Sequence, residues 1–150
     1  FLTPMTDLIM KMDGTIDKYM GDCIMAFWNA PIDCPDHAYK AVKTAVLIKK
    51  RLKELNQENA FGHEIKIGIG INSGEALVGN MGSDQRFDYS VIGDAVNLAS
   101  RLEGTSKNYD TTIIIGEETV KRINKPKWAF RLVDKVQVKG KSEKVSIYTV

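Results

Sequence analysis

Asn97 and Arg101 lie four residues apart in a segment that we expect to form a helix beginning near Asp94. Residues i and i+4 lie one above the other on a helix, so the carboxamide and the guanidinium should project from the same face. A neutral hydrogen-bonding group beside a permanent positive charge suits a ribose next to a phosphate. The segment alone fits equally well a plain surface helix, on which Arg101 contacts solvent and Asn97 fills a polar niche.

Lys18 and Asp22 are two further candidates, and both belong to a predicted hairpin. Residues 15–20 alternate in polarity, Gly21 and Asp22 can form the turn, and the apolar residues 23–28 are typical of a central strand. A carboxylate at the edge of a buried sheet is costly unless a group such as a metal ion compensates it. Because Asp is also favoured in ordinary turns, a simple turn is the plainer explanation of Asp22 on local chemistry. Lys18 either extends its charge to solvent or donates to a ligand.

Composition and charge exclude several classes of protein. The 150 residues fit one domain, and 21 Lys and Arg against 19 Asp and Glu leave a net charge of +2, too little for a general nucleic-acid binder. Two cysteines, Cys23 and Cys34, make no disulfide framework. His37 and His63 lack partners at zinc spacing, so any metal should be bound through oxygen. No apolar run reaches about 20 residues, so we expect a membrane segment only outside this sequence.

The spacing of apolar residues predicts the elements that must position these groups. Helices are expected over 1–12, 37–56, from 94, and over 117–123, and strands over 65–72, 75–81, 87–91, 111–115, 130–138 and 144–150. We expect 65–72 and 75–81 to pair as a hairpin. Gly68 and Gly70 share one face of the first of these strands, which indicates that another backbone, a partner chain or a ligand lies against it. The basic turn at Lys139 could contact phosphate, although such turns are more often only solvated.

Several ordered motifs are carried by residues 14–22, 67–79, 88–103 and 138–141, the last being Val-Lys-Gly-Lys. Together they resemble the catalytic domain of class III adenylate and guanylate cyclases of bacterial type. The resemblance covers essentially the whole of residues 1–150, and motifs in this order are more specific than any one alone. It implies an α/β (α+β) fold, a ferredoxin-like sandwich with a mostly antiparallel sheet flanked by helices. It also implies a head-to-tail homodimer with active sites built from both subunits.

The resemblance implies a reaction and the residues that perform it. Attack of the ATP ribose 3′-oxygen on the α-phosphorus would give cyclic AMP and pyrophosphate, assisted by two divalent cations, Mg²⁺ or Mn²⁺. Asn97 corresponds to the residue that orients the ribose, and Arg101 to the arginine that stabilises the pentavalent transition state. Lys139 corresponds to the lysine that contacts the terminal phosphates. Asp22 corresponds to the second of two metal-binding aspartates.

Two positions correspond to those that read the purine base, Lys18 and Ser90. Lys18 favours ATP, because guanylate cyclases of this family usually carry an acidic residue there. Ser90 takes the place of an Asp or Thr found in many adenylate cyclases. A hydroxyl both donates and accepts, so it should distinguish adenine from guanine less strictly than a carboxylate would. A guanylate cyclase therefore remains an alternative.

The first metal-binding aspartate of the family lies on an initial strand, well before the second. Only 21 residues precede Asp22, while Asp7 and Asp13 fall in the predicted first helix and in the turn after it. We therefore expect the chain to lack the first strand of the fold and one metal ligand, and these 150 residues alone to be inactive. A degenerate cyclase domain that serves dimerisation or nucleotide sensing is a further alternative.

The resemblance also implies the setting in which the domain works. We expect intracellular signal transduction, a location in the cytoplasm or on the cytoplasmic side of a membrane protein, and regulatory domains upstream. Nucleic acid is not an expected partner. A ferredoxin-like fold of the RNA-recognition kind needs exposed strand aromatics in a set motif, which Tyr19, Phe87 and Tyr89 do not form.

Overall fold

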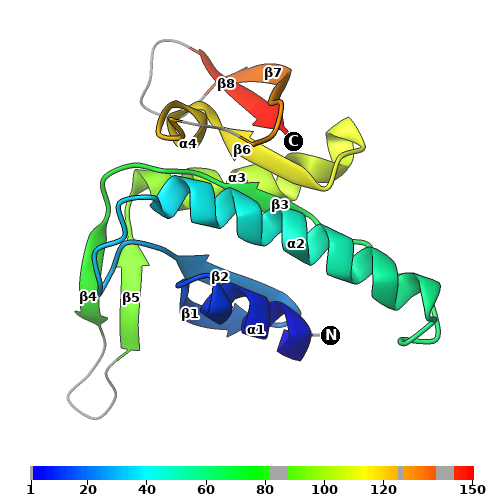
Figure 1. Ribbon diagram of the computed structural model, residues 1–150. Helices are drawn as coiled ribbons and strands as arrows, with labels where there is room; N and C mark the ends of the chain where they lie inside the picture. Colours follow the sequence, from blue (N-terminus) through cyan, green and yellow to red (C-terminus); the bar gives the residue numbers. More distant parts are fainter. Residues whose placement is uncertain (1, 82–87, 125–126, 138–143) are drawn as a thin grey trace. The chain divides into compact units, whose positions relative to one another are not determined.

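The computed structural model describes residues 2–81, 88–124, 127–137 and 144–150 (Figure 1). The chain divides into two compact units. The first unit comprises residues 1–65 and 76–93, and the second comprises residues 66–75 and 94–150. Among the described residues, no helix has both the length and the apolar character needed to cross a lipid bilayer.

Among its described residues, the first unit contains two helices and two pairs of strands. Its elements are α1 (Leu2–Lys11), β1 (Thr15–Met20), β2 (Cys23–Phe27), α2 (His37–Gln57), β4 (Leu77–Met81) and β5 (Asp88–Ile92). Strand β1 pairs with β2, and β4 pairs with β5, both antiparallel. The prediction of a hairpin around Asp22 is confirmed. The prediction that its second arm is a central strand is wrong for the described residues, because β2 pairs there with β1 alone and is only half-buried.

Helix α2 is one residue longer than the predicted helix, and its buried face follows the predicted spacing. The buried face includes Thr44, a polar residue. Its hydroxyl donates to the Lys40 carbonyl at 2.7 Å, which satisfies the buried oxygen within the helix itself.

The described part of the second unit is a four-stranded sheet with helices, in the strand order β3-β6-β8-β7. Its elements are β3 (Ile69–Ile71), α3 (Asp94–Thr105), the 3-10 turn η1 (Ser106–Tyr109), β6 (Ile113–Gly116), α4 (Glu117–Lys121), β7 (Arg131–Gln137) and β8 (Lys144–Thr149). Strands β3 and β6 are parallel, and the other two pairs are antiparallel. Ile114 and Ile147 are fully buried and pack with Leu102 of α3, so the core of this unit lies between the sheet and that helix.

The predicted hairpin over residues 65–81 is wrong. Strand β3 pairs with β6, with Ile69 opposite Ile113, whereas β4 pairs with β5, with Gly79 opposite Ser90. The two strands belong to different units and different sheets. The isoleucine-rich strand β3 pairs with the fully buried strand β6, which the short separation of residues 65–72 and 75–81 in sequence does not reveal.

Gly70 allows helix α3 to pack directly on strand β3. A Cβ atom at this position would collide with the backbone carbonyl of Ala99 and the backbone amide of Glu103. The predicted close approach is therefore confirmed, and another backbone makes it. Because α3 carries Asn97 and Arg101, this contact also fixes the height of both side chains above the sheet.

We expect Gly70→Ala to lower the free energy of unfolding by about 1–3 kcal/mol, because backbone atoms of a packed helix cannot yield as a side chain can. Gly104→Ala, in the same helix, is the matched control, since its Cβ would meet nothing within 4 Å. That variant should be neutral or gain up to about 1 kcal/mol from helix propensity. Urea unfolding followed by circular dichroism measures both, and a Gly70→Ala variant as stable as Gly104→Ala would contradict the packing.

Tyr109 and Asp134 join the turn after α3 to strand β7. The Tyr109 hydroxyl donates to Asp134 Oδ2 at 2.7 Å. This hydrogen bond raises the pKa of Tyr109 above its ordinary value of 10.0 and lowers the pKa of Asp134 below its ordinary value of 3.8. Because folding lowers the pKa of Asp134, the hydrogen bond stabilises the fold at any pH above the pKa of this carboxyl in the unfolded chain. This stabilisation is lost as the pH falls through the pKa of the carboxyl in the folded protein. Because folding raises the pKa of Tyr109, the same bond stabilises the fold at any pH below the pKa of this hydroxyl in the unfolded chain. This stabilisation is lost as the pH rises through the pKa of the hydroxyl in the folded protein.

Removing this hydroxyl should therefore have a pH-dependent effect. We expect Tyr109→Phe to lower the Tm most between about pH 5 and pH 9, with the difference from wild type narrowing below about pH 4 and above about pH 10. Tyr148→Phe, on β8, is the control for loss of a tyrosine hydroxyl. Thermal unfolding across this pH range provides the measurement, and a deficit of constant size at every pH would refute the role of the bond.

Candidate active site

The predicted site residues fall in both units. Lys18, Asp22 and Ser90 belong to the first unit, and Asn97 and Arg101 belong to the second. Lys139 lies outside the described residues.

Strand β1 is irregular at Asp17, directly before Lys18. Its register on β2 pairs Ile16 with Ala26 and Lys18 with Met25, so Asp17 is the extra residue of a β-bulge. Such a bulge redirects side chains that would otherwise alternate strictly between the two faces. The Asp17 side chain is 2% exposed, whereas the Lys18 side chain is 50% exposed. The bulge thus places a carboxylate inside the unit and an ammonium at its surface.

The Asp17 carboxylate connects Lys18 with Ser90. The Ser90 hydroxyl lies 2.9 and 3.1 Å from the two carboxylate oxygens, and the backbone N–H of Val91 donates to Oδ2 at 3.2 Å. The ammonium nitrogen of Lys18 lies 3.9 Å from Oδ1. Ser90 itself is 7% exposed. The structure therefore gathers both predicted base-reading residues around one buried acid.

Asp17 was not among the residues that the sequence indicated. The available signal was a pair of consecutive charged residues, Asp17 and Lys18, within a strand of alternating polarity. Strict alternation would place one of the two charges on the apolar face. A bulge at this position, with a buried partner for the carboxylate, resolves that conflict.

Asp22 occupies the turn between β1 and β2, after Gly21 at φ +63°, and is exposed. Within the part of the chain that the structure describes, no group of three or more His, Cys, Asp or Glu side chains is placed to hold a metal ion. As expected, Asp7 lies in α1 and Asp13 lies in the turn after it. Asp13 forms an ion pair with Lys40 there. Asp22 itself contributes one carboxylate. This fits Mg²⁺, which is often held by one or two carboxylates together with substrate phosphates and water.

Asn97 and Arg101 both lie on the exposed face of α3, as their spacing predicts. On the neighbouring face of the helix, Leu98 and Leu102 pack into the core of the second unit. Arg101 Nη1 donates to the backbone carbonyl of Gln137 at 2.8 Å, at the end of β7. A guanidinium has five N–H donors, so this bond holds the side chain and leaves others for a ligand.

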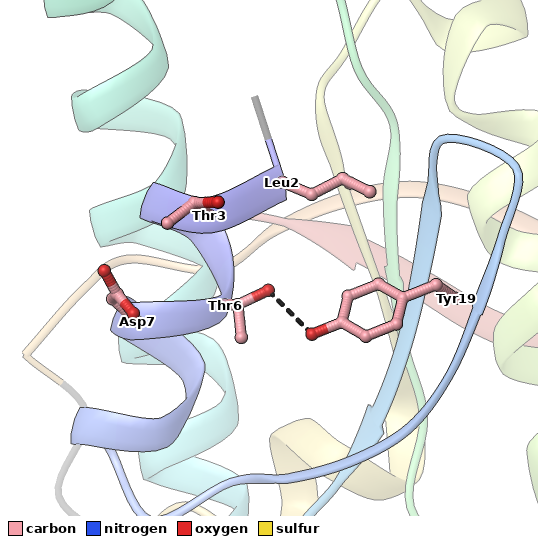
Figure 2. Close-up of a pocket in the computed structure, with 5 residues that line it drawn as sticks. All are labelled: Leu2, Thr3, Thr6, Asp7 and Tyr19. Carbon is pink, nitrogen blue, oxygen red and sulfur yellow. Dashed lines mark hydrogen bonds between the residues drawn. The ribbon is translucent and has the colours of Figure 1, made fainter.

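A pocket of about 280 Å³ lies in the first unit between α1 and β1 (Figure 2). Its lining residues are Leu2, Thr3, Thr6, Asp7 and Tyr19, with the Thr6 and Tyr19 hydroxyls 3.1 Å apart. None of the predicted site residues is among them. Since Tyr19 and Lys18 are consecutive in regular strand beyond the bulge, their side chains point to opposite faces of β1. The pocket is therefore separate from the group around Asp17.

Comparisons with known proteins agree on one family. Residues 2–150 match the adenylate and guanylate cyclase catalytic domain. An adenylate cyclase of Anabaena cylindrica is 42% identical over 100% of this chain, which spans 30% of the length of that relative. The crystal structure of the adenylyl cyclase CyaB from P. aeruginosa matches with a TM-score of 0.83 and 38% identity, over 98% of this chain and 76% of that one.

A guanylyl cyclase is also among the similar structures. The crystal structure of the guanylyl cyclase Cya2 matches with a TM-score of 0.82 and 34% identity, over 98% of this chain and 74% of that one. The predicted fold class, a mixed α+β domain of mostly antiparallel strands flanked by helices, is confirmed by these matches. The chain belongs to the class III adenylate and guanylate cyclase catalytic domains.

Proposed function

We propose that this chain is the catalytic domain of an adenylate cyclase, which converts ATP to 3′,5′-cyclic AMP and pyrophosphate. The observation that carries the choice of ATP is the exposed ammonium of Lys18 beside the buried Ser90 and Asp17. An ammonium only donates hydrogen bonds, so it suits the N1 acceptor of adenine and opposes the N1–H donor of guanine in the same pose. The adenylate cyclases among its relatives support the same choice.

The second unit supplies the groups that act on the ribose and phosphates. Asn97 orients the ribose so that its 3′-oxygen faces the α-phosphorus. Arg101, held at Gln137, places a fixed positive charge where negative charge develops in the transition state. Lys139 contacts the terminal phosphates. As the 3′-oxygen bonds to the α-phosphorus, the bond to the bridging oxygen breaks and pyrophosphate leaves.

Asp22 is the residue of this chain that would hold a divalent cation, Mg²⁺ or Mn²⁺. Two such ions would activate the ribose hydroxyl and neutralise charge on the leaving group. We propose that the site needs a further carboxylate ligand, corresponding to the family's first metal-binding aspartate, and that the 150 residues without it are inactive.

The proposed enzyme is a homodimer with composite active sites. Asp22 of one subunit would serve the same site as Lys18, Ser90, Asn97 and Arg101 of the other. We also propose a cytoplasmic location and regulation by other domains of a longer protein, since this chain spans 30% of the length of its Anabaena relative.

A guanylate cyclase is the second candidate, favoured by the 34% identity to the guanylyl cyclase Cya2. Incubating the full-length protein with ATP or GTP and Mn²⁺, followed by chromatography of the products, separates the two. We expect cyclic AMP and pyrophosphate from ATP, and loss of both on chelation by EDTA. Cyclic GMP as the main product would replace the first candidate by the second, and no cyclic product from either nucleotide would refute both.

A further inference from the structure

The hydrogen bonds around Asp17 give the Ser90 hydroxyl a direction. A carboxylate only accepts hydrogen bonds, whereas a hydroxyl has one proton and two lone pairs. Since Ser90 Oγ lies 2.9 and 3.1 Å from the carboxylate oxygens, its single proton points to Asp17. The oxygen of Ser90 then has only lone pairs left for a ligand.

The other donors around Asp17 keep it in this role. The Val91 N–H donates to Oδ2, and the Lys18 ammonium lies 3.9 Å from Oδ1. Two hydrogen-bond donors and one nearby ammonium group thus surround an acid whose side chain is 2% exposed. A buried carboxylate with such partners is held firmly, because each donor offsets part of the cost of burying its charge.

We propose that Asp17 is the positioning residue for base selection: it holds the Ser90 hydroxyl as an acceptor and the Lys18 ammonium as its neighbouring donor. This inference rests on the proposed nucleotide cyclase function. Adenine presents an amino donor at position 6 and an acceptor at N1, which match an acceptor at Ser90 and a donor at Lys18. Guanine presents an acceptor at position 6 and a donor at N1. In the same pose, its acceptor would face the acceptor at Ser90 and its donor would face the donor at Lys18, so both contacts would be unfavourable.

The arrangement removes the ambiguity of a serine at the base-reading position. A free hydroxyl could rotate to donate to the guanine O6, and it would then accept either base. A hydroxyl that donates its only proton to Asp17 cannot also donate to guanine unless the buried carboxylate loses a hydrogen bond, which is costly. Asp17 thereby lets Ser90 act as a strict acceptor, as a carboxylate would.

The test compares kcat/KM for ATP and GTP in the full-length protein and its variants. Asp17→Asn offers Ser90 an amide donor, and Asp17→Ala removes the acceptor, so in both the hydroxyl regains its freedom. We expect each to lower the ratio of the ATP to the GTP value by at least about tenfold. Ser90→Thr, which keeps the hydroxyl, should retain the wild-type ratio. The exposed Asp33→Asn is the matched control in the same unit and should also retain it.

A double mutant shows whether Asp17 acts through Ser90. In a Ser90→Ala background, Asp17→Asn should produce a clearly smaller further fall in the ratio, because no hydroxyl remains to be oriented and only the contact with Lys18 is lost. A purely structural role would instead lower activity with both nucleotides equally and leave the ratio unchanged. An unchanged ratio in folded Asp17→Asn or Asp17→Ala protein, or the same fall with and without Ser90, would overturn the proposal.

Nucleotide binding separates failure of this inference from failure of the proposed function. Competition of ATP and GTP against a fluorescent ATP analogue measures base preference in a protein that forms no cyclic nucleotide. We expect wild type to favour ATP and Asp17→Asn to lose at least about tenfold of that preference. A mutant that keeps the wild-type binding preference would overturn the role of Asp17, even if cyclic AMP is formed.

Discussion

Arg101→Ala in the full-length protein should lower kcat for cyclic AMP formation by about 100- to 1,000-fold, with a smaller effect on KM. The proposed role of the guanidinium is to stabilise charge that appears only in the transition state, and loss of such a donor has an effect of this size. Initial rates of cyclic AMP formation over a range of ATP concentrations separate kcat from KM.

The matched control for Arg101 is Arg51→Ala on helix α2. Arg51 forms an i,i+3 ion pair with Glu54 at 3.2 Å, and a pair this exposed contributes little. We expect that variant to keep wild-type kinetics. An Arg101→Ala enzyme that loses affinity for ATP but keeps its kcat would show that Arg101 binds the substrate without stabilising the transition state.

Lys18→Glu should reverse or erase the base preference, with a change in the ATP to GTP ratio of kcat/KM of about 100-fold. The substitution replaces a donor by an acceptor at the proposed N1 position, so the contact with adenine is lost and a contact with the guanine N1–H becomes possible. Each of the two changes is a hydrogen bond to a charged group, for which about tenfold is typical. The measurement is turnover of both nucleotides under the same conditions.

Lys53→Glu, on the exposed side of α2, is the charge-matched control for Lys18→Glu. It should leave the ratio unchanged. Because the new carboxylate of Lys18→Glu would lie near Asp17, folding of that variant is checked by circular dichroism before its kinetics are compared. A folded Lys18→Glu protein with the wild-type ratio would remove Lys18 from base reading.

The helices were the part of the fold that the sequence predicted best. Helices α2 and α3 begin at the predicted residues, because long apolar stripes at helical spacing are unambiguous. Strand pairing was harder to predict. The two-residue period of residues 65–72 and 75–81 identifies each strand but carries no information about its partner, which for β3 is β6, more than 40 residues away.

In the candidate site too, features set by nearby residues were predicted, whereas features set by residues distant in sequence were not. The common face of Asn97 and Arg101 follows from helical geometry and was predicted. The direction of the Ser90 hydroxyl was not, because it depends on Asp17, 73 residues earlier in the chain, and on a bulge that no short pattern reveals. Base selectivity therefore appeared loose from the sequence, whereas the hydrogen bonds around Asp17 support a strict acceptor.

The central claim is that two copies of this domain build each active site of an adenylate cyclase. Mixing full-length Asp22→Ala chains with full-length Arg101→Ala chains tests it most directly. Each variant alone should form cyclic AMP at no more than about 1% of the wild-type rate. In an equal mixture, half of the dimers are mixed and each holds one intact site, so about one quarter of wild-type activity should return. No recovery in a mixture shown to contain mixed dimers would contradict the account.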